Sequence, residues 1–203
     1  MTGPATGRAA RLALTARLTT AQRAVALLDR KQRALAAEGE RLELVAVRAA
    51  EAFDEQARAA SGWLRRATAL DGTRAINKST PRATTEVGIG YEVTMGVRHP
   101  TRTDVRFGPQ AEPAGSSALA YTAQAHRAAL VAAVRLAAAQ RSVSLVAAEL
   151  ALTRQQQRAL ELRWIPKLEL RLAELSQRLD ETEREENVRL RWAASRTGTE
   201  DRR

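Results

Sequence analysis

The sequence predicts an all-α-dominated fold: a long antiparallel two-helix coiled coil with a short β-hairpin-containing insertion between the helices. Alanine, leucine, glutamate and arginine dominate and aromatic residues make up only 3%, a composition typical of long helices. Two long segments carry apolar residues at coiled-coil spacing, and a segment rich in glycine and proline separates them. Because neither helix can bury its apolar stripe alone, we expect the two to pack together as a rod with both termini at one end.

The first long helix is predicted over residues 11–70, after an N-terminal tail at 1–10. The stretch contains no proline, and its apolar residues recur with a 3.5-residue period, which indicates a sustained coiled-coil seam. Gly39 falls on this seam, where glycine weakens a helix by about 1 kcal/mol relative to alanine. The main residues of the predicted seam are Leu14, Leu18, Val25, Leu28, Leu35, Leu42 and Phe53.

The middle segment, residues 71–117, holds most of the glycines and prolines. Two runs with β-branched and aromatic residues predict strands at 87–95 and 103–107, and the "HPT" at 99–101 resembles a turn between them. We therefore expect a β-hairpin flanked by loops, lying toward the end of the rod away from the termini.

The second long helix is predicted over residues 118–195, followed by a disordered tail at 196–203. Its first half is rich in alanine, and its second half returns to a regular seam. The polar "TRQQQR" at 153–158 predicts an interrupted register between the two halves. Pro166 removes a hydrogen-bond donor and its ring clashes with the carbonyl of Leu162, so we expect a kink there. The seam of the second half consists of Leu168, Leu172, Leu175 and Leu179.

Few residues suggest chemistry, and we expect no catalytic, cofactor-binding or metal-binding residues. The chain has no cysteine, which excludes disulfides and thiolate sites. His99 and His126 are far apart in sequence, so we expect two unrelated surface histidines and not a zinc site. The acidic run at 180–186 has no histidine nearby, and helical ion pairs such as Glu185 with Arg189 explain it as a solvated face.

The formal net charge of +10 favours acidic partners. The N-terminus lacks the apolar core of a signal peptide, and no stretch approaches the roughly 20 apolar residues of a transmembrane helix, so we expect a soluble, cytoplasmic protein without direct membrane insertion. One alternative is a coiled-coil scaffold. Another is a basic helical hairpin that binds nucleic acid, which would bind less tightly as salt rises; alternation of basic with acidic residues argues against it.

The stretch 158–191, "RALELRWIPKLELRLAELSQRLDETEREENVRLR", resembles the D subunit of the V-type/A-type rotary ATPases. That family has an Ala-Leu-Glu, an Ile-Pro, leucines at helical spacing and an acidic run followed by a basic Arg-Leu-Lys. The N-terminal "LTTAQRAVALLDRKQRAL" is similar to the same family, although Ala24 stands where glycine is usual. The matching N-terminal residues are Ala21, Leu27, Leu28, Lys31 and Leu35.

The resemblance, to a bacterial member, implies a central-stalk rotor shaft without catalytic residues of its own. It couples ATP hydrolysis or synthesis in a ring of A and B subunits to proton or sodium transport through the membrane ring. The implied partners are the A and B subunits around one end, the F subunit on the side and the C/d subunit at the other end, with the complex on the inner face of the cell membrane. We expect the terminal residues to contact the ring: Arg8, Arg11, Arg17, Arg189, Arg191 and Trp192.

The predicted hairpin lies where, under this resemblance, it could regulate ATP turnover through its nearness to the ring or to the F subunit. The residues that we expect to carry this role are Val87, Ile89, Tyr91 and Val93.

Overall fold

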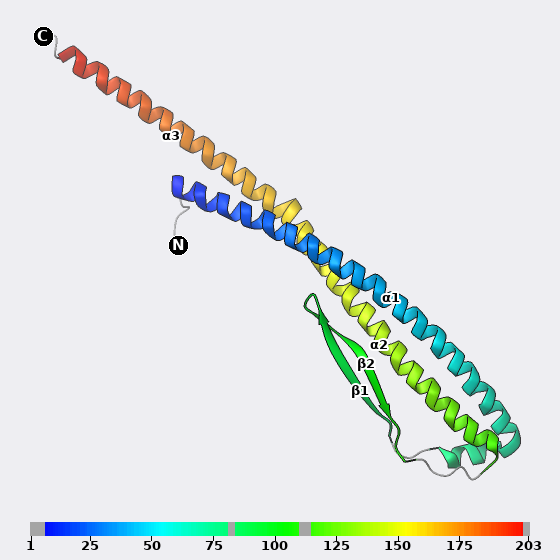
Figure 1. The fold of residues 1–203 in the computed structure, drawn as a ribbon. Helices are drawn as coiled ribbons and strands as arrows, with labels where there is room; N and C mark the ends of the chain where they lie inside the picture. The colour runs from blue at the N-terminus through cyan, green and yellow to red at the C-terminus, as the bar shows by residue number, and fades with distance from the viewer. Residues whose placement is uncertain (1–6, 81–83, 110–114, 201–203) are drawn as a thin grey trace. The chain divides into compact units, whose positions relative to one another are not determined.

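A computed structural model, which describes residues 7–80, 84–109 and 115–200, confirms the predicted fold class. Two long helical segments flank a two-stranded antiparallel hairpin (Figure 1). The chain forms two compact units, one made of Met1–Arg30 with Thr153–Arg203 and the other of Lys31–Leu152; we call them the terminal unit and the hairpin unit. The elements are α1 (Arg8–Ser79), β1 (Glu86–Thr94), β2 (Val97–Arg106), α2 (Ser117–Ala159), the π-helix η1 (Leu160–Trp164) and α3 (Ile165–Glu200).

Helix α1 begins at Arg8, slightly before the predicted residue 11, and ends at Ser79. Its first turn closes with a hydrogen bond from the Arg11 backbone N–H to the Gly7 carbonyl. Near the predicted end at residue 70, Gly72 has φ 74° and ψ 167°, a conformation open to glycine but strained for other residues. The helix is therefore broken at Gly72, although helical turns resume and continue to Ser79.

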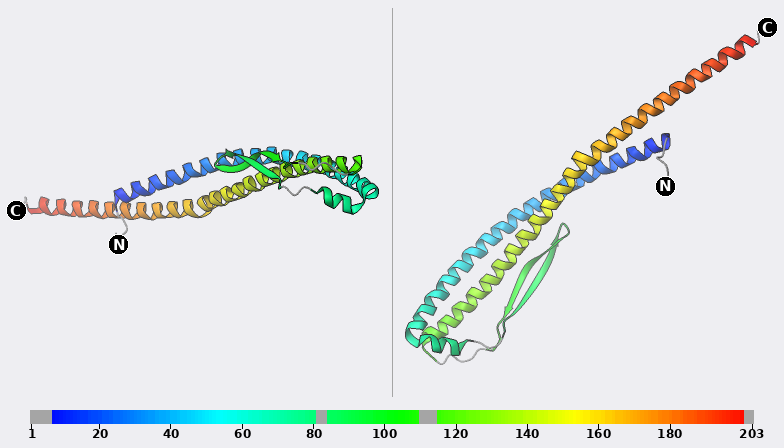
Figure 2. Two further views of the ribbon diagram at one scale, coloured as in Figure 1. Left: turned by 90° about the horizontal axis from the view of Figure 1, so that it is seen from below. Right: turned by 180° about the vertical axis from the view of Figure 1, so that it is seen from behind.

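In the hairpin unit, α1 and α2 run antiparallel side by side (Figure 1, Figure 2). Leu35 and Leu42 of α1, Val146 of α2 and Val97 of β2 form one buried apolar cluster. A second cluster joins Ala67 of α1 to the first residues of α2. Burying one leucine or valine fully contributes about 1.5–3 kcal/mol relative to leaving it exposed, so a few such residues per helix hold the pair together.

The burial along α1 follows a coiled-coil period. Leucines off the seam, such as Leu27 and Leu44, are exposed, because they lie on the opposite side of the helix from its partner. By contrast, all seven residues predicted for the main seam are buried or half-buried: Leu14, Leu18, Val25, Leu28, Leu35, Leu42 and Phe53.

Asp71 ties the end of α1 to the start of α2. Its carboxylate accepts a hydrogen bond from the Ser116 backbone N–H at 2.9 Å and another from the Ser116 hydroxyl. The Ser116 carbonyl in turn accepts the Leu119 N–H at 3.0 Å. The first N–H groups of a helix have no partner within the helix, so Asp71 supplies one from a segment distant in sequence.

The hairpin turn is at Met95–Gly96 and not at "HPT". Both residues have positive φ, 51° and 86°, as in the type I′ turns that match the twist of two-residue hairpins. Strand β2 consequently begins at Val97, six residues before the predicted residue 103, and Pro100 lies within it. The strand register shifts between Gly90 and Tyr91, opposite this proline. Proline has no N–H to donate to the neighbouring strand, and it is tolerated in an edge strand or at a bulge.

The hairpin packs along the helices of its own unit. Val97 joins the Leu35–Val146 cluster, and the Ser142 hydroxyl of α2 donates a hydrogen bond to the Pro100 carbonyl at 2.6 Å. His99, which was expected at the surface, is only 1% exposed. Its Nε2 lies 3.2 Å from the Thr94 hydroxyl, and its Nδ1 has no hydrogen-bond partner in the described residues. Docking against the helices buries this histidine.

The second helical segment extends further than predicted. It continues to Glu200, whereas a disordered tail was expected from residue 196, and residues 201–203 lie outside the described residues. Residues 153–158, where an interrupted register was expected, are regular α-helix, and Thr153 is fully buried. The irregularity lies a few residues later, at η1.

The π-turn η1 explains how the helix accommodates Pro166. The Ile165 N–H donates to the Leu160 carbonyl, an i→i−5 bond that widens one turn. Pro166 has no N–H, and in a regular helix its ring would crowd the Leu162 carbonyl. The wider turn also adds one residue between the half-buried Leu160 and Ile165, after which buried Leu168 resumes the usual spacing. Because the π-turn holds one more residue than an α-helical turn, Leu160 and Ile165 face the same side of the helix although they are five residues apart.

Removing that extra residue together with the proline should therefore be tolerated. We expect a chain with Leu162 deleted and Pro166→Ala to keep its helix content and its thermal midpoint within a few degrees, because the apolar spacing becomes continuous. Deleting the exposed Arg171 in the same Pro166→Ala background rotates the seam after it by about 100°. That control should melt earlier by circular dichroism; equal midpoints for the two deletions would contradict the assignment.

Candidate interaction surfaces

No group of three or more His, Asp or Glu residues in the described ranges is arranged to hold a metal ion. His99 lies on β2 and His126 on α2, where its Nδ1 is 2.9 Å from the Thr122 carbonyl of its own helix. The surface features that stand out are exposed apolar residues and exposed arginines, which are typical of contacts with other proteins.

In the terminal unit, α3 extends past the start of α1 (Figure 1). Arg8, the first residue of α1, pairs with Glu183 at 2.7 Å. Leu179 of the α3 stripe is half-buried, and residues 180–193 after it are all exposed. Three large apolar residues on this stretch, Val188, Leu190 and Trp192, are 60–69% exposed. This end of α3 therefore presents apolar side chains at the surface of the described structure.

The acidic run of α3 engages two of the arginines predicted to contact a ring. Glu183 pairs with Arg8 across the helices and raises the pKa of that guanidinium, while Glu185 pairs with Arg189 at 3.6 Å within α3. The run is therefore solvated, as expected, and it also links α1 to α3. The other predicted arginines form no ion pair with any described residue and are exposed: Arg11, Arg17 and Arg191.

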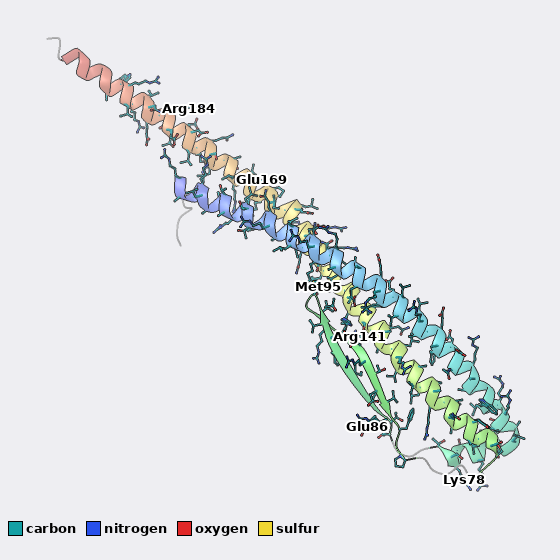
Figure 3. All side chains as sticks on the ribbon, viewed as in Figure 1. Lys78, Glu86, Met95, Arg141, Glu169 and Arg184 are labelled. Atoms are coloured by element: carbon teal, nitrogen blue, oxygen red, sulfur yellow. The ribbon has the colours of Figure 1, made fainter. Side chains whose placement is uncertain are left out.

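One face of β1 carries an exposed apolar row. Alternate residues of a strand share a face, and Val87, Ile89, Tyr91 and Val93 are 45–67% exposed. The Arg98 guanidinium lies 4.4 Å from the Tyr91 ring centroid on the same side. Met95, also exposed, is at the hairpin tip and Glu86 at its base (Figure 3). We call Val87, Ile89, Tyr91 and Val93 the outer row.

Beneath the hairpin, Arg41 and Glu38 of α1 form a two-bonded ion pair, with N···O distances of 2.9 Å and 2.6 Å. The Glu38 side chain is 16% exposed. The hydrogen bonds from Arg41 lower the pKa of Glu38 below its ordinary 4.5, and they outweigh the effect of burial, which raises it.

Sequence reasoning missed an aromatic cluster in the hairpin unit. Trp63 of α1 stacks on Tyr121 of α2 with ring centroids 4.7 Å apart, and the Arg66 guanidinium lies 4.7 Å from the Trp63 ring. Tyr121 is exposed. Trp63 lies at a coiled-coil position of α1, ten residues after Phe53, but Tyr121 lies in the alanine-rich part of the second helix, where spacing alone predicts no partner for it.

By length and composition, one described helical stretch, Ser117–Ala193, contains a window apolar enough to cross a membrane. The expectation that no such segment exists is therefore wrong. A single helix of this kind is weak evidence for a membrane span, because the core helix of a soluble protein satisfies the same criterion of length and composition. Within the hairpin unit, Ser142 and Val146 of this stretch are buried against the hairpin and α1.

A family model described as the D subunit of ATP synthase matches residues 10–195, nearly the whole chain. The match takes in both strands and nearly all of the helical residues described above. Among curated proteins, none matches the chain significantly.

The Glu38–Arg41 pair predicts a specific pH dependence. Because the folded-state pKa of Glu38 is lowered, its stabilising effect is present above its ordinary pKa near 4.5 and is lost as pH falls through the lower folded value. We expect Glu38→Gln to reduce unfolding free energy at pH 7 by about 0.5 kcal/mol and to flatten the loss of stability in acid. Glu40→Gln, at an exposed neighbour, is the control; identical urea midpoints for both variants from pH 3 to 7 would contradict this.

Proposed function

The chain belongs to the family of ATP synthase D subunits, which are stalk subunits of rotary ATPases, and from this membership we propose that it is the central-stalk shaft of a V/A-type ATPase. The observation that carries the proposal is the match across 10–195, together with an antiparallel helix pair sharing an apolar seam. A shaft transmits torque by being stiff and slender, and packed helices provide stiffness without catalytic groups. We propose that the shaft couples ATP hydrolysis or synthesis in the A/B ring to proton or sodium transport.

The end of α3 supports insertion into a ring of A and B subunits. Val188, Leu190 and Trp192 are exposed on a stretch of α3, residues 180–193, in which every residue is exposed. Apolar surface of this kind is stabilised when other subunits surround it, and exposed arginines beside it suit acidic loops. We propose the F subunit as a partner on the side of the helix pair and the C/d subunit beyond the Trp63–Tyr121 cluster.

The proposed location is peripheral, on the cytoplasmic face of the cell membrane as part of the complex. The apolar window in Ser117–Ala193 is consistent with a helix packed inside a protein, because Val146 and Ser142 are buried by α1 and the hairpin. The shaft itself is proposed not to insert into the bilayer, and to act through its contacts with other subunits.

A scaffold or a nucleic-acid-binding hairpin remains the alternative function for any basic coiled coil. The family match favours the shaft over both. Ion pairs also engage three basic residues, Arg8, Lys31 and Arg41, and so reduce the positive charge that these side chains could offer to a phosphate backbone.

Co-purification tests the proposed function directly. Affinity-tagged chain expressed in its native host should retain A, B and F subunits at moderate salt. A scaffold would not retain that set, and a nucleic-acid binder would instead retain nuclease-sensitive material. Recovery of the tagged chain without A and B subunits, at salt concentrations where an A/B complex persists, would refute the shaft.

The arginines without ion pairs provide a test of the ring contact. We expect Arg11→Glu, Arg17→Glu and Arg191→Glu together to reduce the coupled ATPase activity of a reconstituted complex about tenfold, since like charges would face acidic loops. The matched control makes the same charge change at Arg48, Arg65 and Arg154, which are also exposed. If both triple variants turn over ATP equally, the terminal arginines do not contact the ring.

The outer row provides a test of regulation by the hairpin. We propose that it contacts a neighbouring subunit and sets the rate of ATP turnover. Replacing Val87, Ile89 and Val93 with threonine keeps strand propensity but makes this face polar. We expect a several-fold change in ATPase rate with helix content unchanged. Threonine at exposed Leu27 and Leu44 is the control, and an unchanged rate for the hairpin variant would exclude this role.

A further inference from the structure

An open groove of about 640 Å³ lies between the hairpin and the two helices of its unit. Four elements line it: α1, α2, β2 and, through Glu92, β1. Three of them contribute one arginine each: Arg41 from α1, Arg102 from β2 and Arg135 from α2. The residues Thr101 and Thr103 also line this groove. Three arginines from separate elements therefore surround one space.

The arginines of the groove are not neutralised equally. Arg41 is paired with Glu38, and Asp104, the acid nearest in sequence to Arg102, is paired with Arg106 at 2.9 Å. In the described part of the chain, Arg102 and Arg135 form no ion pair. Two arginines are thus left with guanidinium donors free of carboxylate partners.

Gly90 favours this arrangement of Arg102. The two residues are cross-strand partners, and a Cβ on Gly90 would lie 3.1 Å from the Arg102 Cβ. A larger residue at position 90 would push against the arginine stem. With glycine there, the stem lies flat across β1.

Acidic residues reduce the positive charge of the groove but do not cancel it. Glu92 lines it and, with Glu38, lies close enough to Arg41 to raise the pKa of that guanidinium. The remaining surface is largely apolar, with Leu42, Val45 and Ala139 among the lining residues. Arg102 and Arg135 are themselves exposed, so water screens each of them, and it is the presence of two guanidinium groups on one groove that would hold an anion more firmly than a single exposed arginine.

We propose that this groove binds an oxyanion of the phosphate class, held by Arg102 and Arg135 with the threonine hydroxyls as further donors. Guanidinium groups bind phosphate oxygens through paired N–H donors. Inorganic phosphate and the phosphates of a nucleotide share this chemistry. An anion there bridges β2 to α2 and holds the hairpin against the helices, so on the proposed function it would regulate the outer row. Binding itself does not depend on that function.

Titration calorimetry of the full chain tests the site, with sodium phosphate and ATP as separate ligands at constant ionic strength. We expect saturable binding that weakens about tenfold for each arginine replaced in Arg102→Gln and Arg135→Gln. Arg106→Gln and Arg141→Gln are the matched controls on the same two elements, and neither residue lines the groove. Tighter binding of ATP than of phosphate would identify a nucleotide as the ligand.

Backbone amide shifts at Thr101 and Thr103 give a second measurement that does not depend on the variants folding. They should move on titration with phosphate, and not on titration with sodium chloride. The site is excluded if neither ligand binds saturably, or if the groove and control variants bind equally. Because no ATPase activity is measured, failure here leaves the shaft proposal standing, and failure of co-purification leaves the site standing.

Discussion

The structure depends on one constraint: a long amphipathic helix cannot bury its apolar stripe alone. Burial along α1 follows a coiled-coil period, with Leu35 and Leu42 buried and Leu27 exposed. The apolar surface buried where two stripes face each other offsets most of the conformational entropy that the chain loses on folding. A glycine or proline that would interrupt the stripe therefore changes the helix only near its own position. Gly72 breaks α1 only after its seam has ended, and the π-turn η1 removes one residue from the stripe before Pro166.

The fold class and seam could be predicted because they depend on periodicity, which a sequence displays directly. Three features could not. The first is the position of the hairpin turn: Met95 has a positive φ, but Met-Gly is not a typical turn sequence as Asn-Gly is, whereas the proline at 100 suggested a turn at "HPT". The register change was expected at 153–158 and a kink at Pro166, but neither expectation named the π-turn, which lies at Leu160–Trp164, directly before Pro166. Hairpin docking through Val97 and Ser142 is a tertiary contact between distant residues, and no local pattern encodes it.

The candidate surfaces could be predicted only in part from the sequence. Arginines at both ends of the chain are visible in the sequence, but which of them pair with the acidic run depends on how α1 and α3 align. Arg8 and Arg189 are engaged by Glu183 and Glu185, which leaves Arg11 exposed without a carboxylate partner in the described residues. The groove beneath the hairpin is formed by residues of four elements, so sequence alone offered no sign of it.

As the proposed shaft, this helix pair should turn within the A/B ring. The chain has no cysteine, so a single Lys78→Cys substitution on exposed α1 gives a unique attachment point for an optical probe. In an immobilised assembly with the A/B ring, ATP should drive stepwise rotation of the probe in one direction. ATP hydrolysis at an unchanged rate with a stationary probe would show that the helix pair does not rotate as a shaft.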